Sequence, residues 1–364
     1  MTGLVPAEYR RRPFRSETID GIAHHWVWTP GGIHRSRAAR VANYAGFVTA
    51  AGARALGLPR PDVVLVSSPP LPVAGLGPLL ARRFDRPWLL EVRDIWPESA
   101  VSVGWLSSDG LAYRALANFA RSVTRRAAVV IVPTPGLEPL VRNHGAQEIA
   151  VLPGIVTARS LDLERRRNTR IRLGFSHDDC VFLYLGAIGV ANGLDLLLEA
   201  VGALPPSTPA RIVVAGDGSA RSKFAEALAS RRLDRITLLP PVTQDGVADL
   251  LAAADVGLHM LRPDPVFGSA LPTKALEYLG AGLPFVTTVP GLPTEVAVAS
   301  GGAAVSSASD LAGEFVTWAA MSKDERRVRG EQALTYGLER FGLEASTTRL
   351  EALLGRVMAG RPPG

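Results

Sequence analysis

A lysine and a glutamate stand three residues apart in the segment GSALPTKALEYLGAGLPFV (268–286). Pro272 is typical of the first turn of a helix, so Lys274 and Glu277 are expected to share one helix face near its start. A helix N-terminus and a lysine suit a diphosphate, and a carboxylate can accept hydrogen bonds from two ribose hydroxyls. The alternative is a solvated ion pair on a surface helix. Both interpretations stay open on the spacing alone.

A glycine-rich loop, GAIGVANG (186–193), follows an apolar run and precedes a predicted helix. Glycines let the backbone approach a ligand, and the helix start offers free N–H groups to a phosphate. The pattern equally fits a tight structural turn. It lacks the G-x-G-x-x-G spacing of dinucleotide-binding folds, which disfavours a nicotinamide-dependent oxidoreductase.

Polar side chains also follow the predicted strands of the first half. Open parallel sheets bind ligands beyond the carboxyl ends of their strands, so these residues are candidates for a second substrate. Asp94 has an alternative role as a carboxylate that caps the turn before Trp96-Pro97. The residues concerned are Ser67, Ser68, Arg93, Asp94, Trp96 and Glu98.

Repeated βα units are predicted to position these residues, because short apolar runs alternate with longer amphipathic segments along the sequence. Two domains fit the length of 364 residues. We predict strands at 62–67, 87–92, 127–132 and 149–152, and then at 181–185, 211–215, 235–239, 255–260 and 284–288.

Two α/β domains with parallel sheets are therefore expected, at 1–165 and 166–335. The charged stretch 159–172 is predicted to link them. The tail, 322–359, is predicted to form two helices broken near Phe341-Gly342, with 336–364 returning to the first domain.

Charge is unevenly distributed over a net +6. Residues 1–165 hold 20 Lys and Arg against 13 Asp and Glu, whereas the remainder holds 20 against 21. The basic half predicts an anionic partner: a membrane surface, a lipid diphosphate or nucleic acid. Nucleic acid is disfavoured, because the sequence has no zinc-ligand spacing and no RNA-binding aromatic signature.

Localisation is expected to be cytoplasmic. The sequence has no apolar run long enough to span a membrane and no signal-peptide pattern. Its lone cysteine, Cys180, excludes an internal disulfide framework and is expected to be a buried apolar residue.

The segment from Trp26 to Leu56 has two interpretations. Its tryptophans and arginines would suit contact with an anionic lipid leaflet. It would equally suit a helix that packs its apolar stripe on its own sheet. The residues concerned are Trp26, Trp28, Val41, Tyr44, Phe47 and Val48, with Arg35, Arg37 and Arg40.

The histidines do not form a catalytic constellation with a serine or cysteine. His259 ends a predicted strand and is the one that would point at a ligand. The others are expected in a strand, in loops or at helix ends: His24, His25, His34, His144 and His177.

Several motifs together resemble the family 4 retaining glycosyltransferases of GT-B fold. They are Glu277 followed by YLGAGLPFV, GDG at 216–218 and LLAAADVGL at 250–258. The segments VVLVSSPPLPVAGLG, PWLLEVRDIWPESAV and SALPTKALEY are similar to the branch that includes N-acetyl-L-fucosamine transferases of surface-polysaccharide assembly. The resemblance runs from about Val5 to Phe341.

The resemblance implies two Rossmann-like domains facing a cleft, and transfer of a sugar from a nucleotide diphosphate to a hydroxyl. Glu277 would bind the donor ribose. Lys274, with Arg262, would offset the diphosphate charge, and Pro241 and Val242 would meet the nucleobase. The remaining donor-binding residues would be Gly186, Ile188, Gly189, Gly216, Ser269, Ala270, Leu271, Pro272 and Thr273.

On the acceptor side the resemblance assigns Arg93 and Asp94 the catalytic positions, with Ser67, Ser68, Trp96 and Glu98 around the acceptor. The departing phosphate oxygen can itself take the acceptor's proton, so positioning and charge stabilisation carry the catalysis. No metal or other cofactor is expected.

Four departures from the family pattern affect these expectations. Ser269 replaces the first of two glutamates, Ala187 and Asn192 replace a basic pair, and Pro153-Gly154-Ile155 replaces a Pro-Asn-Gly turn. The family's first strand, glycine loop, helix and second strand, about 40 residues, have no counterpart, which would leave a sheet edge uncovered. We therefore expect a truncated first domain, through a misplaced start, a fragment or dependence on a protein partner.

The expected function is transfer of a sugar to a polyprenyl-diphosphate-linked acceptor at the cytoplasmic face of the membrane. A soluble small-molecule acceptor is the second interpretation. A catalytically silent, partner-dependent subunit is the third, and it is motivated by the truncation and the absent basic pair.

Overall fold

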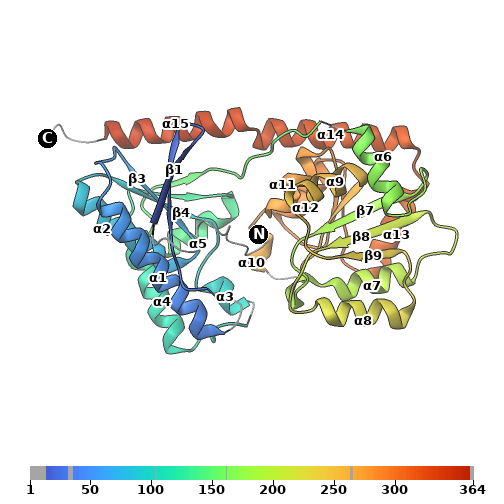
Figure 1. Cartoon of the computed structure of the whole chain (residues 1–364), viewed down its shortest axis with the longest axis horizontal. Helices are drawn as coiled ribbons and strands as arrows, with labels where there is room; N and C mark the ends of the chain where they lie inside the picture. The colour runs from blue at the N-terminus through green and yellow to red at the C-terminus, as the bar shows by residue number, and fades with distance from the viewer. Residues whose placement is uncertain (1–13, 32–35, 103, 161, 263–264, 361–364) are drawn as a thin grey trace. The chain divides into compact units, whose positions relative to one another are not determined.

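The computed structural model describes residues 14–31, 36–102, 104–160, 162–262 and 265–360 (Figure 1). The chain forms two compact units, which we describe separately. Unit 1 comprises residues 1–152 and 349–364, and unit 2 comprises residues 153–348. The division thus lies at Pro153 rather than at the expected 165, and residues 336–348 belong to unit 2.

Unit 1 is built on a four-stranded parallel sheet in the order β3-β4-β5-β6. The strands are β3 (Val64–Ser68), β4 (Trp88–Val92), β5 (Val129–Val132) and β6 (Ile149–Val151). Its helices are α1 (Arg37–Leu56), α2 (Leu76–Phe84), α3 (Glu98–Ser102), α4 (Leu111–Thr124) and α5 (Glu138–Asn143), with short 3-10 turns at Leu71–Gly75 and Pro135–Leu137.

Close packing fixes unit 1 on both faces of its sheet. Trp88 is buried, and its indole N–H donates to the carbonyl of Arg126 at 2.8 Å. A methyl group at Gly77 would lie 2.1 Å from the Trp88 ring, so α2 approaches β4 as only a glycine allows. On the other face, Leu353 of α15 (Leu343–Ala359) packs with Leu89 and two β5 side chains.

An antiparallel hairpin precedes this sheet, formed by β1 (Phe14–Ile19) and β2 (Ile22–Val27). Its turn is Asp20-Gly21, and both residues have positive φ, 50° and 80°. Asp-Gly favours this two-residue turn, because its twist matches the flanking strands. We predicted a strand around the paired histidines but missed its partner.

Unit 2 is built on a six-stranded parallel sheet in the order β12-β11-β10-β7-β8-β9. The strands are β7 (Cys180–Leu185), β8 (Ala210–Ala215), β9 (Ile236–Leu239), β10 (Val256–His259), β11 (Phe285–Thr287) and β12 (Ala303–Ala304). The helices are α6 (Leu163–Arg172), α7 (Leu194–Gly202), α8 (Arg221–Arg231), α9 (Gln244–Ala253), α10 (Pro265–Gly268), α11 (Thr273–Gly280), α12 (Leu292–Ala299), α13 (Ala308–Ala320) and α14 (Lys323–Phe341), with a 3-10 turn at Val190–Asn192.

Helices cover both faces of this sheet. One core contains α7, α13 and the side chains of Phe182 and Tyr184, and the other contains α9, α11, α12 and the side chains of Val181 and Leu183. The alternation along β7 explains its uninterrupted apolar sequence, since both faces are buried. The two-unit α/β architecture with parallel sheets is as predicted.

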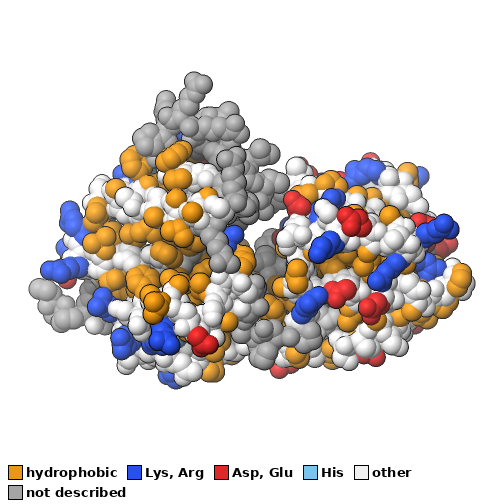
Figure 2. Space-filling view, turned by 90° about the horizontal axis from the view of Figure 1, so that it is seen from below, with side chains coloured by type: hydrophobic (Ala, Val, Ile, Leu, Met, Phe, Trp, Pro, Cys, Tyr) orange, Lys and Arg blue, Asp and Glu red, His pale blue; other side chains and the backbone are white. Residues whose placement is uncertain are grey.

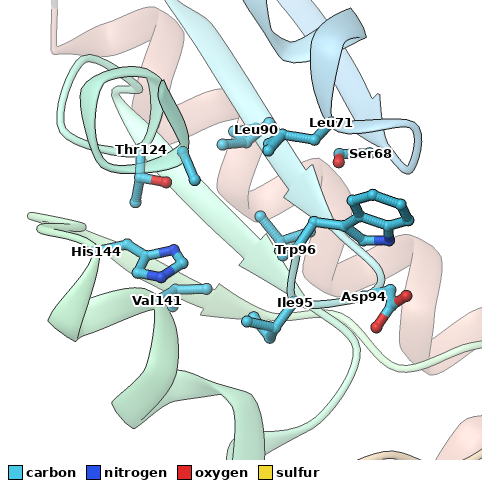
Figure 3. Close-up of a pocket in the computed structure, with 11 residues that line it drawn as sticks. Ser68, Leu71, Leu90, Asp94, Ile95, Trp96, Thr124, Val141 and His144 are labelled. Atoms are coloured by element: carbon cyan, nitrogen blue, oxygen red, sulfur yellow. The ribbon is translucent and has the colours of Figure 1, made fainter. Parts of the chain in front are cut away.

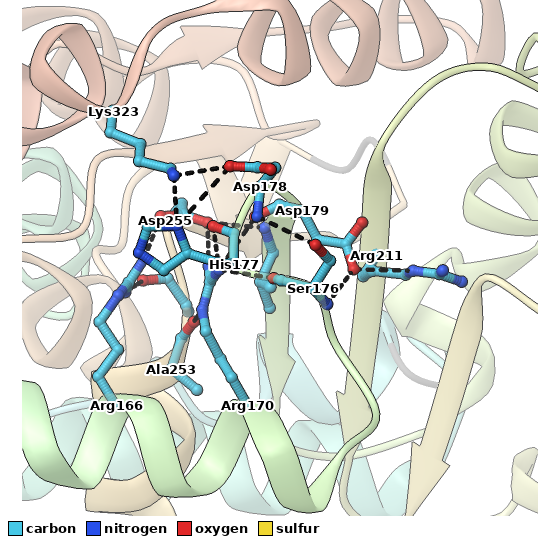
Figure 4. Close-up of polar contacts among 12 residues, drawn as sticks. Arg166, Arg170, Ser176, His177, Asp178, Asp179, Arg211, Ala253, Asp255 and Lys323 are labelled. Carbon is cyan, nitrogen blue, oxygen red and sulfur yellow. Dashed lines mark hydrogen bonds and ion pairs between the residues drawn. The ribbon is translucent and has the colours of Figure 1, made fainter.

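The predicted linker 159–172 is wrong, because most of it forms helix α6 of unit 2. Asp162 caps the helix by accepting from the backbone N–H of Arg165. Arg166 and Arg170 both reach Asp255, with N–O distances of 2.6 Å each, and Asp255 also accepts from a β7 backbone N–H (Figure 4). Sequence analysis missed this pairing because the partners lie more than 80 residues apart.

Burial of the Arg170 guanidinium in this cluster disfavours its charged form. It lowers the pKa of the Arg170 guanidinium, while Asp255 acts in the opposite direction and favours the charged form. The nine predicted strands are all present within two residues of their expected bounds, and the tail breaks at Gly342 as expected.

Candidate functional site

The strand order of unit 2 reverses between β7 and β10. From β7 the chain adds β8 and β9 on one side, and then returns to add β10, β11 and β12 on the other. Ligands of open α/β sheets bind at such a switch point, beyond the carboxyl ends of the strands. Here those ends are Leu185, followed by Gly186, and His259.

Helix α11 is fixed beside this point by Tyr278, which is fully buried. The Tyr278 hydroxyl donates toward the carbonyls of Leu183 (3.0 Å) and Leu258 (3.3 Å), and it accepts from the N–H of Leu185 (3.1 Å). It therefore ties α11 to β7 and β10 at once. A methyl group at Gly257 would lie 2.3 Å from the Tyr278 ring, so this contact also depends on a glycine.

Lys274 lies one turn before Tyr278 on α11 and is partly buried. Its Nζ is 4.1 Å from the ring centre of Tyr184, and a methyl group added at Gly186 would be 3.1 Å from it. Burial lowers the pKa of Lys274 to about 8, and the Glu277 carboxylate opposes this shift. The lysine thus belongs to the switch point, and the surface ion pair that the spacing left open does not describe it.

Two glycine loops meet beside Lys274. Ile188 donates its N–H to the carbonyl of Asp217 at 2.8 Å, and its own carbonyl accepts from Ala220 at 2.9 Å. A methyl group at Gly216, whose φ is 155°, would lie 1.8 Å from the carbonyl oxygen of Gly186. The loops 186–189 and 216–218 therefore need glycine for their mutual approach, and the buried Ile188 side chain, with both of its backbone groups hydrogen-bonded to the second loop, holds them together.

The positions of the absent basic pair shape the first loop. The Asn192 side chain accepts from the N–H of Gly189 at 3.0 Å, and the Ala187 carbonyl accepts from the Tyr184 hydroxyl at 2.6 Å. Arg262 was expected to assist Lys274. Its guanidinium pairs instead with Asp195 at 3.3 Å, on an exposed surface.

The other predicted donor residues lie around the same edge. Helix α11 begins after Pro272 with no side-chain cap, so its first amides face the loop that precedes it. Pro241 and Val242 follow the carboxyl end of β9. The backbone N–H of Gly216 donates to the carbonyl of Leu239, the last residue of that strand. Ser269, Ala270, Leu271 and Thr273 are also located at the start of α11, and their roles remain predictions.

In unit 1 the predicted acceptor residues gather at the carboxyl end of β3 and β4. Ser68, Asp94 and Trp96 line a cavity of about 20 Å³, room for about one water molecule (Figure 3). The other three predicted residues, Ser67, Arg93 and Glu98, do not line this cavity, and Ser67 and Arg93 are exposed. The Asp94 carboxylate accepts from the Ser99 hydroxyl at 3.0 Å, and its role as a cap or as a substrate contact stays a prediction.

Glu98 has a partner that the sequence did not predict. His144 Nε2 lies 3.1 Å from Glu98 Oε1, and His144 also lines the cavity (Figure 3). Burial raises the pKa of Glu98, but the hydrogen bond and charge of His144 outweigh it, so the net pKa is lowered. His144 lies at the end of α5, as expected of a helix-end residue, and no local spacing in the sequence connects it to Glu98.

Tyr184 and Thr287 are further residues of the unit 2 edge that sequence analysis missed. Tyr184 was counted only as part of an apolar strand, and Thr287 as a strand end. Both become visible only from the strand order, which places the ends of β7, β10 and β11 side by side.

The described part of the chain contains no cluster of three or more His, Cys, Asp or Glu side chains that could hold a metal ion. None of its described helices is long and apolar enough to cross a membrane.

Comparison with protein families assigns both halves of the chain. Residues 2–154 match the model of a glycosyl transferase 4-like domain, and residues 179–319 match the model of glycosyl transferases group 1. A D-inositol 3-phosphate glycosyltransferase of Xylanimonas cellulosilytica is 30% identical over 239 residues, which cover 62% of this chain and 56% of that protein. The probable glycosyltransferase WbjE of Pseudomonas aeruginosa is 25% identical, over 63% of this chain and 58% of that protein. The chain thus spans little more than half the length of these relatives.

Solved structures share the fold at low identity. Sucrose-phosphate synthase of Thermosynechococcus elongatus has a TM-score of 0.73 at 17% identity, covering 97% of this chain and 87% of its own. WaaG, a glycosyltransferase involved in lipopolysaccharide biosynthesis, has a TM-score of 0.63 at 18% identity, covering 92% and 86%. Anabaena HepE, solved with UDP-glucose, has a TM-score of 0.68 at 17% identity, covering 88% and 84%. With both halves matched by glycosyltransferase models, the chain belongs to the family-4-like glycosyltransferases of GT-B fold.

Proposed function

We propose that the chain transfers a sugar, with retention of configuration, from a nucleoside diphosphate donor held in unit 2 to an acceptor hydroxyl. The observation that carries the proposal is Lys274, a partly buried cation at the switch point between β7 and β10. Burial of the ammonium group destabilises its charged form, and an anionic ligand bound beside it would offset that destabilisation.

The donor would lie across the carboxyl edge of the sheet. Lys274 and the uncapped start of α11 would bind the diphosphate. Glu277, one turn along the same face, would accept the ribose hydroxyls. The glycine loops would approach the sugar and phosphate with their backbones, and Pro241 with Val242 would border the base.

In this reaction the protein would mainly stabilise developing charge and hold the reacting groups in position. As the bond between the sugar and the phosphate breaks, negative charge grows on the departing phosphate oxygen, and Lys274 with the α11 amides would stabilise it. That oxygen would take the proton of the attacking hydroxyl on the same face of the sugar. Arg93 and Asp94 remain our candidates for contact with the acceptor, and the proposal includes no resident metal.

For the acceptor we propose a polyprenyl-diphosphate-linked sugar, as in the branch of surface-polysaccharide assembly that the first-half motifs resemble. The supporting observations are the basic character of residues 1–165 and exposed apolar side chains of unit 1, including Trp26, Trp28 and Val41. Figure 2 shows that hydrophobic side chains cover much of one face of this unit. Phe47 and Val48 pack instead on the core of unit 1, so only part of that segment fits an interfacial role.

The arginines predicted to accompany these apolar side chains are only partly described. Arg35 lies outside the described residues, and the Arg37 side chain is not described. Arg40 is placed, with its guanidinium 4.2 Å from the ring centre of Trp105.

A soluble acceptor is the second candidate, and the relatives named D-inositol 3-phosphate glycosyltransferases favour it. The two separate in one assay: initial rates on a long-chain lipid-linked acceptor in anionic vesicles, and on short-chain and soluble analogues. Arg40→Glu should lower the rate in vesicles and leave the rate on short-chain analogues unchanged if the lipid acceptor is correct. Equal rates on all acceptors for both proteins would favour the soluble acceptor.

The donor site is tested by thermal unfolding with UDP, dTDP, GDP and ADP. A ligand at 100 times its dissociation constant adds about 2.7 kcal/mol to the unfolding free energy, which is visible as a melting shift. Glu277→Ala should lose the shift, whereas Glu339→Ala, at an exposed position of α14, should keep it. No shift with any nucleotide, from folded protein, would contradict the donor site and leave the silent, partner-dependent subunit.

A further inference from the structure

His259 is the last residue of β10, at the switch point of unit 2. It is 1% exposed, and its Nε2 is buried without a hydrogen-bond partner in the described structure. Its Nδ1 lies 3.0 Å from the hydroxyl of Thr287, the register partner of His259 on β11. Buried polar groups are nearly always paired, so an orphaned ring nitrogen at a ligand-binding edge calls for a partner from outside the protein.

The hydrogen bonds around Thr287 assign the proton of His259. The Thr287 hydroxyl accepts from the N–H of Val289 at 3.1 Å, and it is itself fully buried. Its own hydrogen therefore needs an acceptor, and His259 Nδ1 is in position to be one. With Nδ1 accepting, the neutral imidazole carries its proton on Nε2, so the orphaned atom is a donor.

The geometry of the sheet brings this donor level with Lys274. Gly257 packs against the Tyr278 ring, and the next residue on that face of β10 is His259, about 6.6 Å further toward the carboxyl edge. Helix α11 connects β10 to β11 and runs opposite to them. Lys274 precedes Tyr278 by four residues, so along the helix axis it lies about 6 Å closer to the carboxyl edge of the sheet than Tyr278 does.

Electrostatics agree with this placement. Burial and the charge of Lys274 lower the pKa of His259 to about 3. The imidazole is therefore neutral near pH 7 and offers a hydrogen bond without adding a second buried positive charge.

We propose that His259 Nε2 donates a hydrogen bond to a phosphate oxygen of the donor's diphosphate, beside Lys274. The inference rests on the proposed donor site and deepens it. It supplies a donor group in a chain where Ala187 and Asn192 occupy the positions of the family's basic pair. Thr287 is the positioning residue, because its hydroxyl holds the proton of His259 on Nε2.

The test compares phosphate-dependent and base-dependent binding in the same variant. Titration calorimetry would measure UDP and uridine, or the matching pair for whichever base stabilises the wild-type chain. His259→Leu should weaken the diphosphate roughly 10- to 100-fold, the cost of a hydrogen bond to a charged group, and leave the nucleoside unchanged. His259→Gln, whose amide N–H reaches the region of Nε2, should recover part of the loss.

Thr287 gives an independent arm that leaves the imidazole in place. Thr287→Val should weaken the diphosphate and spare the nucleoside, whereas Thr287→Ser, which keeps the hydroxyl, should bind as the wild type does. Unchanged diphosphate affinity in His259→Leu, or in Thr287→Val if the former fails to fold, would overturn the inference. Equal loss of nucleoside and diphosphate would overturn it too, because it would indicate a structural role only. Failure of the wild-type chain to bind any nucleotide would instead refute the proposed donor site itself.

Discussion

Nucleotide affinity should fall as the pH rises through about 8, and Lys274→Arg should remove most of that fall. Burial lowers the pKa of Lys274 to about 8, so the ligand-free site loses its positive charge above that pH. A bound diphosphate favours the charged form, and binding at higher pH must therefore take up a proton. An arginine keeps its charge throughout this range.

The expected size follows from linkage. If only the protonated form binds, the affinity is divided by one plus ten raised to the difference between pH and pKa. At pH 9 this is about 11-fold, or about 1.4 kcal/mol, and at pH 7 the loss is only about a tenth. The neighbouring groups do not reproduce the effect: His259, with a pKa of about 3, stays neutral, and burial raises the pKa of Tyr184 above its ordinary value.

Isothermal titration between pH 7 and 9.5, in two buffers of different ionisation enthalpy, measures both affinity and proton uptake. After subtraction of the ionisation of the base, measured with the nucleoside, the wild-type chain should approach one proton taken up per diphosphate bound at pH 9 and Lys274→Arg should take up almost none. The nucleoside should show only the pH dependence of its own base, and that dependence should be equal in the two proteins. The second ionisation of a phosphate group, near pH 6, lies below this range. A flat affinity profile in the wild type, or the same slope in Lys274→Arg, would refute the reasoning.

Three further variants test the packing around the site, with unfolding in urea as the common measurement. Lys274→Met should raise the unfolding free energy of the ligand-free chain at pH 7 by about 1–2 kcal/mol. A buried cation with a lowered pKa destabilises the folded state, and its cation–π contact with Tyr184 offsets only part of that effect. A lower unfolding free energy in the variant would contradict this reasoning. Asp255→Ala should lower the unfolding free energy by about 3–5 kcal/mol, because it leaves two arginines without their carboxylate. The control Asp324→Ala removes an exposed ion pair and should change the unfolding free energy by no more than about 0.5 kcal/mol. Similar values for the two variants would refute the role of the buried cluster. Gly216→Ala should destabilise the chain by more than about 2 kcal/mol, because its methyl group would lie 1.8 Å from a carbonyl oxygen of the facing loop. The control Gly313→Ala places a methyl group in open space on α13 and should stabilise the chain by about 0.5–1 kcal/mol. Equal effects of the two variants would exclude the close approach of the loops.

The sequence by itself determined the local elements. Apolar runs bounded by turn residues predicted nine parallel strands, and the charge pattern with Gly342 predicted two terminal helices. These signals are local, since a strand or helix buries a face whose period is written in adjacent residues. The pairing of Lys274 with Glu277 on one helix face could be predicted for the same reason.

Only the tertiary structure decided which loops meet. Strand order places β7 beside β10, and that order alone brings Gly186, Lys274 and His259 to one edge. It also turned the expected linker into α6, whose arginines reach a carboxylate more than 80 residues away. Burial, and with it the lowered pKa of Lys274 and the orphaned nitrogen of His259, depends on neighbours distant in the chain, which is why no spacing in the sequence could reveal it.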